Sequence, residues 1–440
     1  MRSINRKTVE RLLKGSAAVF VFKLLGAVAF FVLSLMISHY VGTAVLGKFN
    51  LIAKLILLLS VFAMLGLDTY VVRKMPEIGQ DRHKTVSFLI SSIRVITVMS
   101  LILLVSVVMT RNLIDRSFFK GGGMSFFIIL AGISVWLYSL YSFICQFFRG
   151  MGSVVAYGFF RYTAIHAFAV LMLLMVLVFT GTISESWVYY GYYLTILVGT
   201  LALSLYLLFF LKRYQFLHTM PDAVPSKPNL KGSQPMMWSS SLAFVMSYVD
   251  IFVIGYLIGE YEVGIYSAIQ QFMLIFTYVS ISIASYSAPL LADRFIRGDQ
   301  AGLRSLYVNS IVAGAILLFP IFVVLAGFPK MVLGMTFGPA YVAHAHLMTI
   351  LSIGFFINAL TGPTVTMMNM TDNQSKLLLF SISNVAIGLV LTCVLTYFFS
   401  LTGAAIASSI VTALFRLALF FYITLKILKP RATQTASLRS

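Results

Sequence analysis

The sequence predicts an all-helical integral membrane protein with about twelve transmembrane helices. Of its 440 residues, 60% are hydrophobic, and the mean hydropathy is +0.96. Only 10% are charged, whereas soluble chains carry about 25%. Apolar runs long enough to cross a bilayer recur along the chain, separated by short polar segments. These observations exclude a soluble enzyme.

The apolar runs place each span to within a few residues. The first run follows the basic segment Arg2 to Lys14, as in a signal peptide, but it is too long and has no clear small-residue cleavage site. We expect it to remain as a span. The twelve predicted spans are about 15–39, 49–70, 86–110, 124–148, 157–180, 187–211, 236–258, 264–290, 304–327, 341–368, 377–399 and 403–427.

The basic residues predict the orientation of the chain. Of the 32, the two termini and alternate loops hold 22, and the opposite loops hold five. Because Lys and Arg concentrate on the cytoplasmic side, both termini are expected in the cytoplasm. The net charge of +19 is then a feature of topology, and no nucleic-acid partner is expected.

A composition shift divides the chain into two halves of six spans. Four of the eleven prolines fall between positions 221 and 235, which predicts a linker. We expect an N-terminal six-helix lobe at 1–211, a cytoplasmic linker at 212–234 and a C-terminal six-helix lobe at 235–440.

The two halves share a motif in their first connecting loop. Its two glycines and its aromatic residue recur 217 residues later, and the pairs are Gly42 and Gly259, Gly47 and Gly264, and Phe49 and Tyr266. Because each half has an even number of spans, the two copies enter the membrane in the same direction. The sequence therefore predicts parallel repeats with a substrate path between them.

Five short motifs occur in order along nearly the whole chain. They are Gly66-Leu-Asp68 followed by Arg73 and Pro76; Phe148-Arg149-Gly150-Met151-Gly152; Tyr248-Val-Asp250 leading to Val263-Gly264-Ile-Tyr266; Phe337-Gly338-Pro339-Ala-Tyr341; and Gly362-Pro363 followed by Asn369. As an ordered set they resemble the Wzx-type O-antigen flippases of the multidrug/oligosaccharidyl-lipid/polysaccharide (MOP) flippase superfamily.

This resemblance implies a MATE-like fold of two lobes around a central cavity. It also implies transport of undecaprenyl-diphosphate-linked O-antigen or other polysaccharide repeat units from the cytoplasmic to the periplasmic leaflet by alternating access. The location would be the bacterial inner membrane. The implied partners are the lipid-linked oligosaccharide, membrane lipids and the polysaccharide polymerase or chain-length machinery.

Ionisable residues inside spans are the candidate site residues, because a charge at mid-bilayer costs about 2.5–3.5 kcal/mol and normally faces a cavity, forms a pair or snorkels. A phosphate-bearing substrate needs compensating positive charge. The predicted substrate-binding set is Lys23, Lys54, Arg94, Arg416, Asp250, Gln270 and Gln271. At about 8 Å inside its predicted span, Lys54 is also within reach of the headgroups, as is Arg161.

Asp68 and Asp250 are predicted either to pair with a basic residue as a gate or to carry a coupling proton or sodium ion. The polar residues of these spans are equally compatible with helix packing through hydrogen bonds. No nucleotide-binding motif or metal-ligand set occurs, so no cofactor or metal is expected.

Two other functions remain as alternatives. A drug or metabolite antiporter on the same fold is disfavoured by the excess of basic over acidic residues inside the spans. A membrane polysaccharide polymerase or glycosyltransferase is less favoured, because the periplasmic loops are short and offer few carboxylates.

Overall fold

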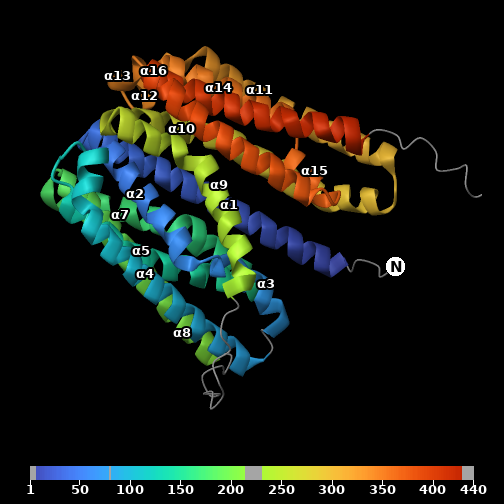
Figure 1. Ribbon diagram of the computed structural model, residues 1–440, viewed down its shortest axis with the longest axis horizontal. Coiled ribbons are helices and arrows are strands. Elements are labelled where there is room, and N and C mark those ends of the chain that lie inside the picture. Colours follow the sequence, from blue (N-terminus) through green and yellow to red (C-terminus); the bar gives the residue numbers. More distant parts are fainter. Residues whose placement is uncertain (1–5, 79–80, 214–229, 429–440) are drawn as a thin grey trace, which may run out of the picture. The chain divides into compact units, whose positions relative to one another are not determined.

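The computed structural model describes residues 6–78, 81–213 and 230–428, which form helices and no strand (Figure 1). Eleven of these helical segments are long and apolar enough to cross a membrane. The predicted all-helical membrane fold is confirmed.

The chain divides into two compact units. The first comprises Met1–Tyr248 with Gly259–Gly264, and the second comprises Val249–Ile258 with Ile265–Ser440. Helices α9 (Leu230–Leu257) and α10 (Glu260–Ile296) contribute residues to both units. The linker predicted at 212–234 lies mostly outside the described residues, so the lobe boundaries given above stay predictions.

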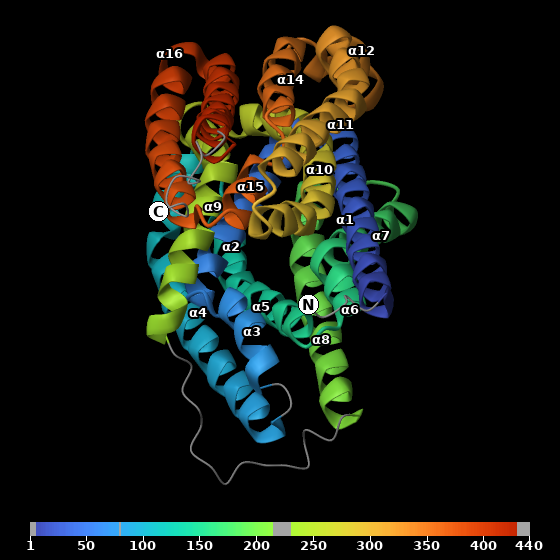
Figure 2. The same cartoon turned by 90° about the vertical axis from the view of Figure 1, so that its right-hand side faces the viewer.

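The first unit is built around α5, which packs against α2, α3, α4 and α8. Helix α1 lies along α6, a π-helical segment and α7 (Figure 2). The helices are α1 (Arg6–Tyr40), α2 (Thr43–Met64), α3 (Leu67–Ile78), α4 (Arg82–Phe118), α5 (Ser125–Gly150), α6 (Val154–Gly158), the π-helical segment (Phe159–Ala164), α7 (Ile165–Thr180), α8 (Glu185–Arg213) and the first part of α9.

The second predicted span is shifted toward the N-terminus. Helix α2 begins at Thr43, directly after Gly42, and ends at a turn where Leu65 and Gly66 have φ of 49° and 78°. The prediction of 49–70 was therefore wrong at both ends, because polar residues at the start of α2 are buried against protein and lower the hydropathy signal. Lys54 consequently lies about 16 Å from the start of α2, near its middle.

The second unit places α14 between α11 and α16. Its helices are the end of α9, α10 from Ile265, α11 (Gln300–Gly327), α12 (Pro329–Thr336), α13 (Pro339–Val342), α14 (Ala345–Leu360), α15 (Thr364–Met370), α16 (Gln374–Tyr422) and a π-helical segment (Ile423–Ile427).

One predicted span of this unit is broken, and the last two predicted spans are joined by a sharp turn. The span predicted at 341–368 is broken between α14 and α15, where Gly362 has φ of 70° and Pro363 supplies no N–H. The spans predicted at 377–399 and 403–427 correspond to two helical arms within Gln374–Ile427, one on each side of Ser400. The arms meet at a sharp turn at Ser400, whose φ and ψ are 51° and −137°, and Gly403 of the second arm packs against the Leu395 backbone of the first.

Two helices at corresponding places in the repeats begin in the same way. Asp81 caps α4 by accepting a hydrogen bond from the Lys84 backbone N–H, and Asp299 caps α11 by accepting one from Gly302. Each carboxylate satisfies one of the N–H groups that the first helical turn leaves without an intrahelical partner. The local structure therefore repeats along with the span pattern.

Candidate functional site

Lys54 lies in the first unit with its ammonium group against two aromatic rings. The Nζ atom is 4.4 Å from the ring centre of Tyr248 on α9 and 5.6 Å from that of Phe30 on α1. The electron-rich face of an aromatic ring attracts a cation, by about 2 kcal/mol when the pair is removed from water. These contacts hold the half-buried Lys54 side chain inside the bundle rather than directing it to a headgroup.

His166 on α7 extends this site and was not identified from the sequence. Its ring centre is 5.0 Å from that of Phe30, the ring that Lys54 also contacts. Within the described residues, its buried Nδ1 has no hydrogen-bond partner. A lone histidine in an apolar span carries no pattern that distinguishes a site residue from a packed one. Its place here depends on four helices that converge on Lys54.

Lys23 lies on the same side of α1 as Phe30, because residues seven apart share a helix face. Its Nζ is 5.7 Å from the ring centre of Tyr162 in the π-helical segment. Gly26 fixes this approach, since a Cβ there would overlap the backbone of Tyr162. The structure thus places both predicted cations of the first two spans, Lys23 and Lys54, in contact with aromatic rings of the first unit.

Arg161 does not extend to the headgroups as expected. Its guanidinium donates hydrogen bonds to Ser142 Oγ at 3.0 Å and to Tyr138 Oη at 3.5 Å, both on α5. Asp68, the predicted gating or ion-coupling residue, lies in the first turn of α3. Arg161 is therefore held by hydroxyl groups of α5, and the pairing of Asp68 with a basic residue remains a prediction.

Arg94 is separate from the Lys54 site. Its side chain is exposed on α4, as are Ile90 and Val98 one turn away on either side. A face of this composition suits lipid, to which long basic side chains adapt by extending toward the headgroups. The predicted role of Arg94 in binding remains a prediction.

Asp250 forms a hydrogen-bonded cluster in the second unit. The carboxylate is 6% exposed and accepts hydrogen bonds from Tyr266 Oη at 2.7 Å and Gln270 Nε2 at 3.1 Å. Tyr266 and Gln270 are four residues apart on α10 and therefore share a face. Gln271, next along α10, is also buried. The cluster provides a buried carboxylate with charge-stabilising donors, a group that suits either a gate or an ion site.

Arg416 marks the broken span of the second unit. Its Nη1 donates to Thr364 Oγ1 at 3.1 Å, in the first turn of α15. On the other side of the break, Tyr307 donates to the Thr361 carbonyl at 2.7 Å. Discontinuous helices expose backbone groups and frequently form transporter binding sites. The structure thus places Arg416 at a break that hydropathy does not reveal.

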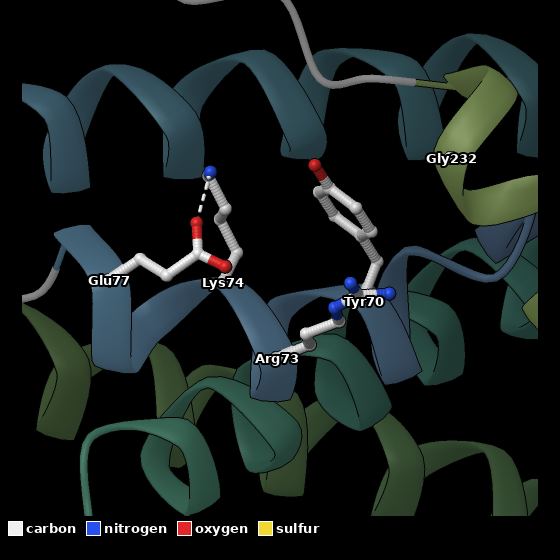
Figure 3. Close-up of a pocket in the computed structure, with 5 residues that line it drawn as sticks. All are labelled: Tyr70, Arg73, Lys74, Glu77 and Gly232. Atoms are coloured by element: carbon white, nitrogen blue, oxygen red, sulfur yellow. Dashed lines mark hydrogen bonds and ion pairs between the residues drawn. The ribbon is translucent and has the colours of Figure 1, made fainter.

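A pocket of about 290 Å³ lies at α3, lined by Tyr70, Arg73, Lys74, Glu77 and Gly232 (Figure 3). The hydrogen bond between Lys74 and Glu77 raises the pKa of the amine and lowers the pKa of the carboxyl. With Lys74 paired, Arg73 supplies the uncompensated positive charge of this pocket. None of the residues predicted as substrate-binding lines it.

Residues 6–78, 81–213 and 230–428 contain no group of three or more His, Cys, Asp or Glu side chains that could hold a metal ion. The buried charged groups instead have aromatic, hydroxyl and amide neighbours. This chemistry suits noncovalent binding of a charged ligand.

The sequence itself identifies the family. Residues 12–295 match the family described as polysaccharide biosynthesis protein. The chain belongs to this family. The relation to polysaccharide biosynthesis proteins inferred from the ordered motifs is thereby confirmed.

A similar protein is also consistent with membership of this family. The probable low-salt glycan biosynthesis flippase Agl15 of Haloferax volcanii is 23% identical over 194 residues, which cover 42% of this chain and 40% of Agl15. The chain therefore matches less than half the length of that relative.

Solved structures share the fold of the polysaccharide biosynthesis protein. The lipid II flippase MurJ in an inward closed conformation has a TM-score of 0.72 at 13% identity, covering 94% of this chain and 87% of MurJ. A MATE family multidrug resistance transporter of the MOP superfamily, inward-facing, has a TM-score of 0.69 at 13% identity, covering 94% and 96%. The predicted MATE-like architecture is confirmed by these matches.

Proposed function

We propose that the protein is a flippase for lipid-linked oligosaccharides rather than an enzyme. The proposed substrate is an undecaprenyl-diphosphate-linked O-antigen or other polysaccharide repeat unit. It would move from the cytoplasmic to the periplasmic leaflet by alternating access through a cationic cavity. Family membership and the similarity to Agl15 support the substrate class.

The positive charge of Lys54 carries this proposal. Across the described part of the chain, no carboxylate lies within ion-pair distance of its Nζ. Aromatic rings orient the ammonium group without neutralising it. A half-buried charge with only this compensation favours an anionic ligand, and the diphosphate of a lipid-linked sugar supplies the opposite charge.

The other candidate residues take supporting roles in the proposal. Lys23 provides a second positive charge in the first unit, and Arg416 provides one at the break in the second. Gln270 and Gln271 offer amides to sugar hydroxyls, and Arg94 assists at the lipid-facing side. Asp250, with Asp68, either gates the cavity or binds the coupling ion.

The proposed location is the bacterial inner membrane, with both termini in the cytoplasm. The distribution of basic residues supports this orientation. A polysaccharide polymerase or chain-length protein would then receive the repeat unit on the periplasmic side.

A cellular experiment tests the proposal. In a strain that lacks this gene, wild-type protein should restore surface polysaccharide. Lys54→Gln should fail to do so at equal membrane abundance, while lipid-linked repeat units accumulate. Lys330→Gln removes an exposed lysine outside the described spans and is the matched control. Full restoration by Lys54→Gln, or efflux of cationic drugs without polysaccharide export, would overturn the proposal.

A further inference from the structure

Two basic residues of the first unit are joined by a pair of tyrosines. Lys23 Nζ is 5.7 Å from the ring centre of Tyr162. The hydroxyls of Tyr162 and Tyr157 are 3.4 Å apart, and the Arg149 guanidinium lies 5.4 Å from the ring centre of Tyr157. We name these four residues the Lys23–Arg149 track.

The π-helical segment Phe159–Ala164 aligns the two tyrosines. Residues five apart on a regular α-helix point about 140° away from one another. A π-helix closes its hydrogen bonds between residues five apart, and this brings such residues to the same side. The hydroxyls of Tyr157 and Tyr162 meet because the helix changes type between them. Segments of this kind are frequent at functional sites.

Close backbone packing holds the track against α1. A Cβ on Gly158 would lie 2.9 Å from Phe22 Cδ2, and one on Gly26 would overlap the Tyr162 carbonyl. Thr163 Oγ1 also donates to the Phe22 carbonyl at 2.7 Å. These contacts leave little freedom between α1 and the π-helical segment, so the position of Lys23 over Tyr162 is fixed by backbone as well as by side chains.

Arg149 is the most exposed residue of the track. Arg149, in the last turn of α5, is exposed, while Tyr162 and Lys23 are half-buried and Tyr157 is buried beneath the guanidinium. Within the described ranges, no carboxylate forms an ion pair with Arg149. A guanidinium held over a ring by a cation–π contact keeps its N–H donors available, and these can match two phosphate oxygens at once.

We propose that Arg149, held by Tyr157, is a docking site for the diphosphate group of the lipid-linked substrate, from which the track leads to Lys23. This inference rests on the proposed function. It gives Arg149 a role beyond its contribution to topology. Tyr157 acts as a positioning residue, because it supports the guanidinium from below.

Binding of geranylgeranyl diphosphate to the full-length protein tests this site. The protein is placed in nanodiscs of phosphatidylcholine, so that the surrounding lipid carries no net charge. Arg149→Gln should weaken binding about tenfold or more, since hydrogen bonds between charged groups are lost. Arg304→Gln, which removes an exposed arginine of the second unit, should bind as wild type does.

Two tyrosine variants separate support of the guanidinium from general effects on folding. Tyr157→Phe keeps the ring and should preserve binding. Tyr157→Leu removes the stacking surface and should weaken binding several-fold, with little further loss when combined with Arg149→Gln. Equal effects of Phe and Leu would overturn the positioning role of the ring.

The remaining outcomes distinguish this inference from the proposed function. If wild type binds and Arg149→Gln binds equally well, the docking site is wrong and the flippase proposal stands. If wild type does not bind the prenyl diphosphate, both are overturned. If phosphatidylglycerol in the nanodisc abolishes the difference between wild type and Arg149→Gln, Arg149 is a general anchor for anionic lipid, and the docking site is again wrong.

Discussion

Gly47 and Gly264 occupy the same position in the two repeats, and each packs against the backbone of the other copy. A Cβ on Gly47 would overlap the Glu260 carbonyl, and one on Gly264 would overlap the Thr43 carbonyl. Thr43 and Glu260 are themselves 217 residues apart, as are the two glycines. The motif shared by the two halves is therefore a reciprocal contact between the first turns of α2 and α10.

Alanine at either glycine should destabilise the protein. There is no space for the methyl group, so the backbones must separate, and overpacking of this kind costs about 1–3 kcal/mol. We expect Gly47→Ala and Gly264→Ala to lower the thermal unfolding temperature in detergent by several degrees. Gly327→Ala is the control, because nothing lies within 4 Å of a Cβ there. Unchanged unfolding temperatures for both variants would contradict the close contact.

The ring of Tyr248 should matter more than its hydroxyl. Tyr248→Phe keeps the aromatic face beneath the Lys54 ammonium and is expected to transport at nearly the wild-type rate. Tyr248→Leu loses an attraction of about 0.5–2 kcal/mol and should slow transport about threefold or more. Initial rates at equal protein abundance provide the measurement. Similar rates for the Phe and Leu variants would mean that the ring does not position Lys54.

Removal of the Asp250 carboxylate should lower the thermal stability of the protein. In Asp250→Ala the Tyr266 hydroxyl and the Gln270 amide lose a buried acceptor, which costs about 1–3 kcal/mol for each unsatisfied group. Asp250→Asn retains an acceptor and should keep more of the wild-type thermal stability. Scanning fluorimetry of the two variants would test this order, and equal stability would contradict the role of the cluster.

Asp250→Asn also tests ion coupling. If the carboxylate binds the driving ion, the variant should fold but lose the acceleration of transport by an imposed proton or sodium gradient. Transport rates with and without each gradient are the readout. A full response to the gradient in Asp250→Asn would leave Asp250 with only a structural or gating role.

The Asp299 cap should give a pH-dependent contribution to stability. Hydrogen bonds from the Gly302 backbone and the Arg294 side chain lower the pKa of Asp299 below its ordinary value of 3.8. Its contribution is therefore present above the unfolded-state pKa and is lost as the pH falls through the lower folded-state pKa. Wild type should unfold at a higher temperature than Asp299→Ala at pH 7, and the difference should shrink below about pH 4. If the difference in unfolding temperature persisted at lower pH, the Asp299 carboxylate would not be its source.

Much of the fold follows from the sequence because hydrophobic length, basic loops and the repeated Gly motif each have a direct physical cause. The errors at α2 arise where Thr43 and Asn50 are buried against other helices, since hydropathy cannot distinguish polar residues that face protein from those that face water. The break at Gly362 is a local backbone feature within apolar sequence, whereas the turn at Ser400 falls where the sequence predicts the boundary between two spans.

The candidate site was only partly predictable. Charge inside a span singled out Lys23 and Lys54, and the structure gives both an aromatic neighbour. The charge pattern could not indicate His166 or Tyr248, because their proximity to Lys54 depends on helices far apart in the sequence. Likewise, no sequence pattern predicts the π-helical segment that aligns Tyr157 with Tyr162.

Flipping by purified protein in proteoliposomes tests the central claim most directly. Vesicles carry a fluorescent prenyl-diphosphate-linked oligosaccharide, and a membrane-impermeant glycosidase reports how fast the sugar reaches the opposite leaflet. The account predicts rapid exchange with wild type and Lys330→Gln, and exchange near the rate of protein-free vesicles with Lys54→Gln. Exchange with Lys54→Gln as fast as with wild type, or none above protein-free vesicles with wild type, would contradict it.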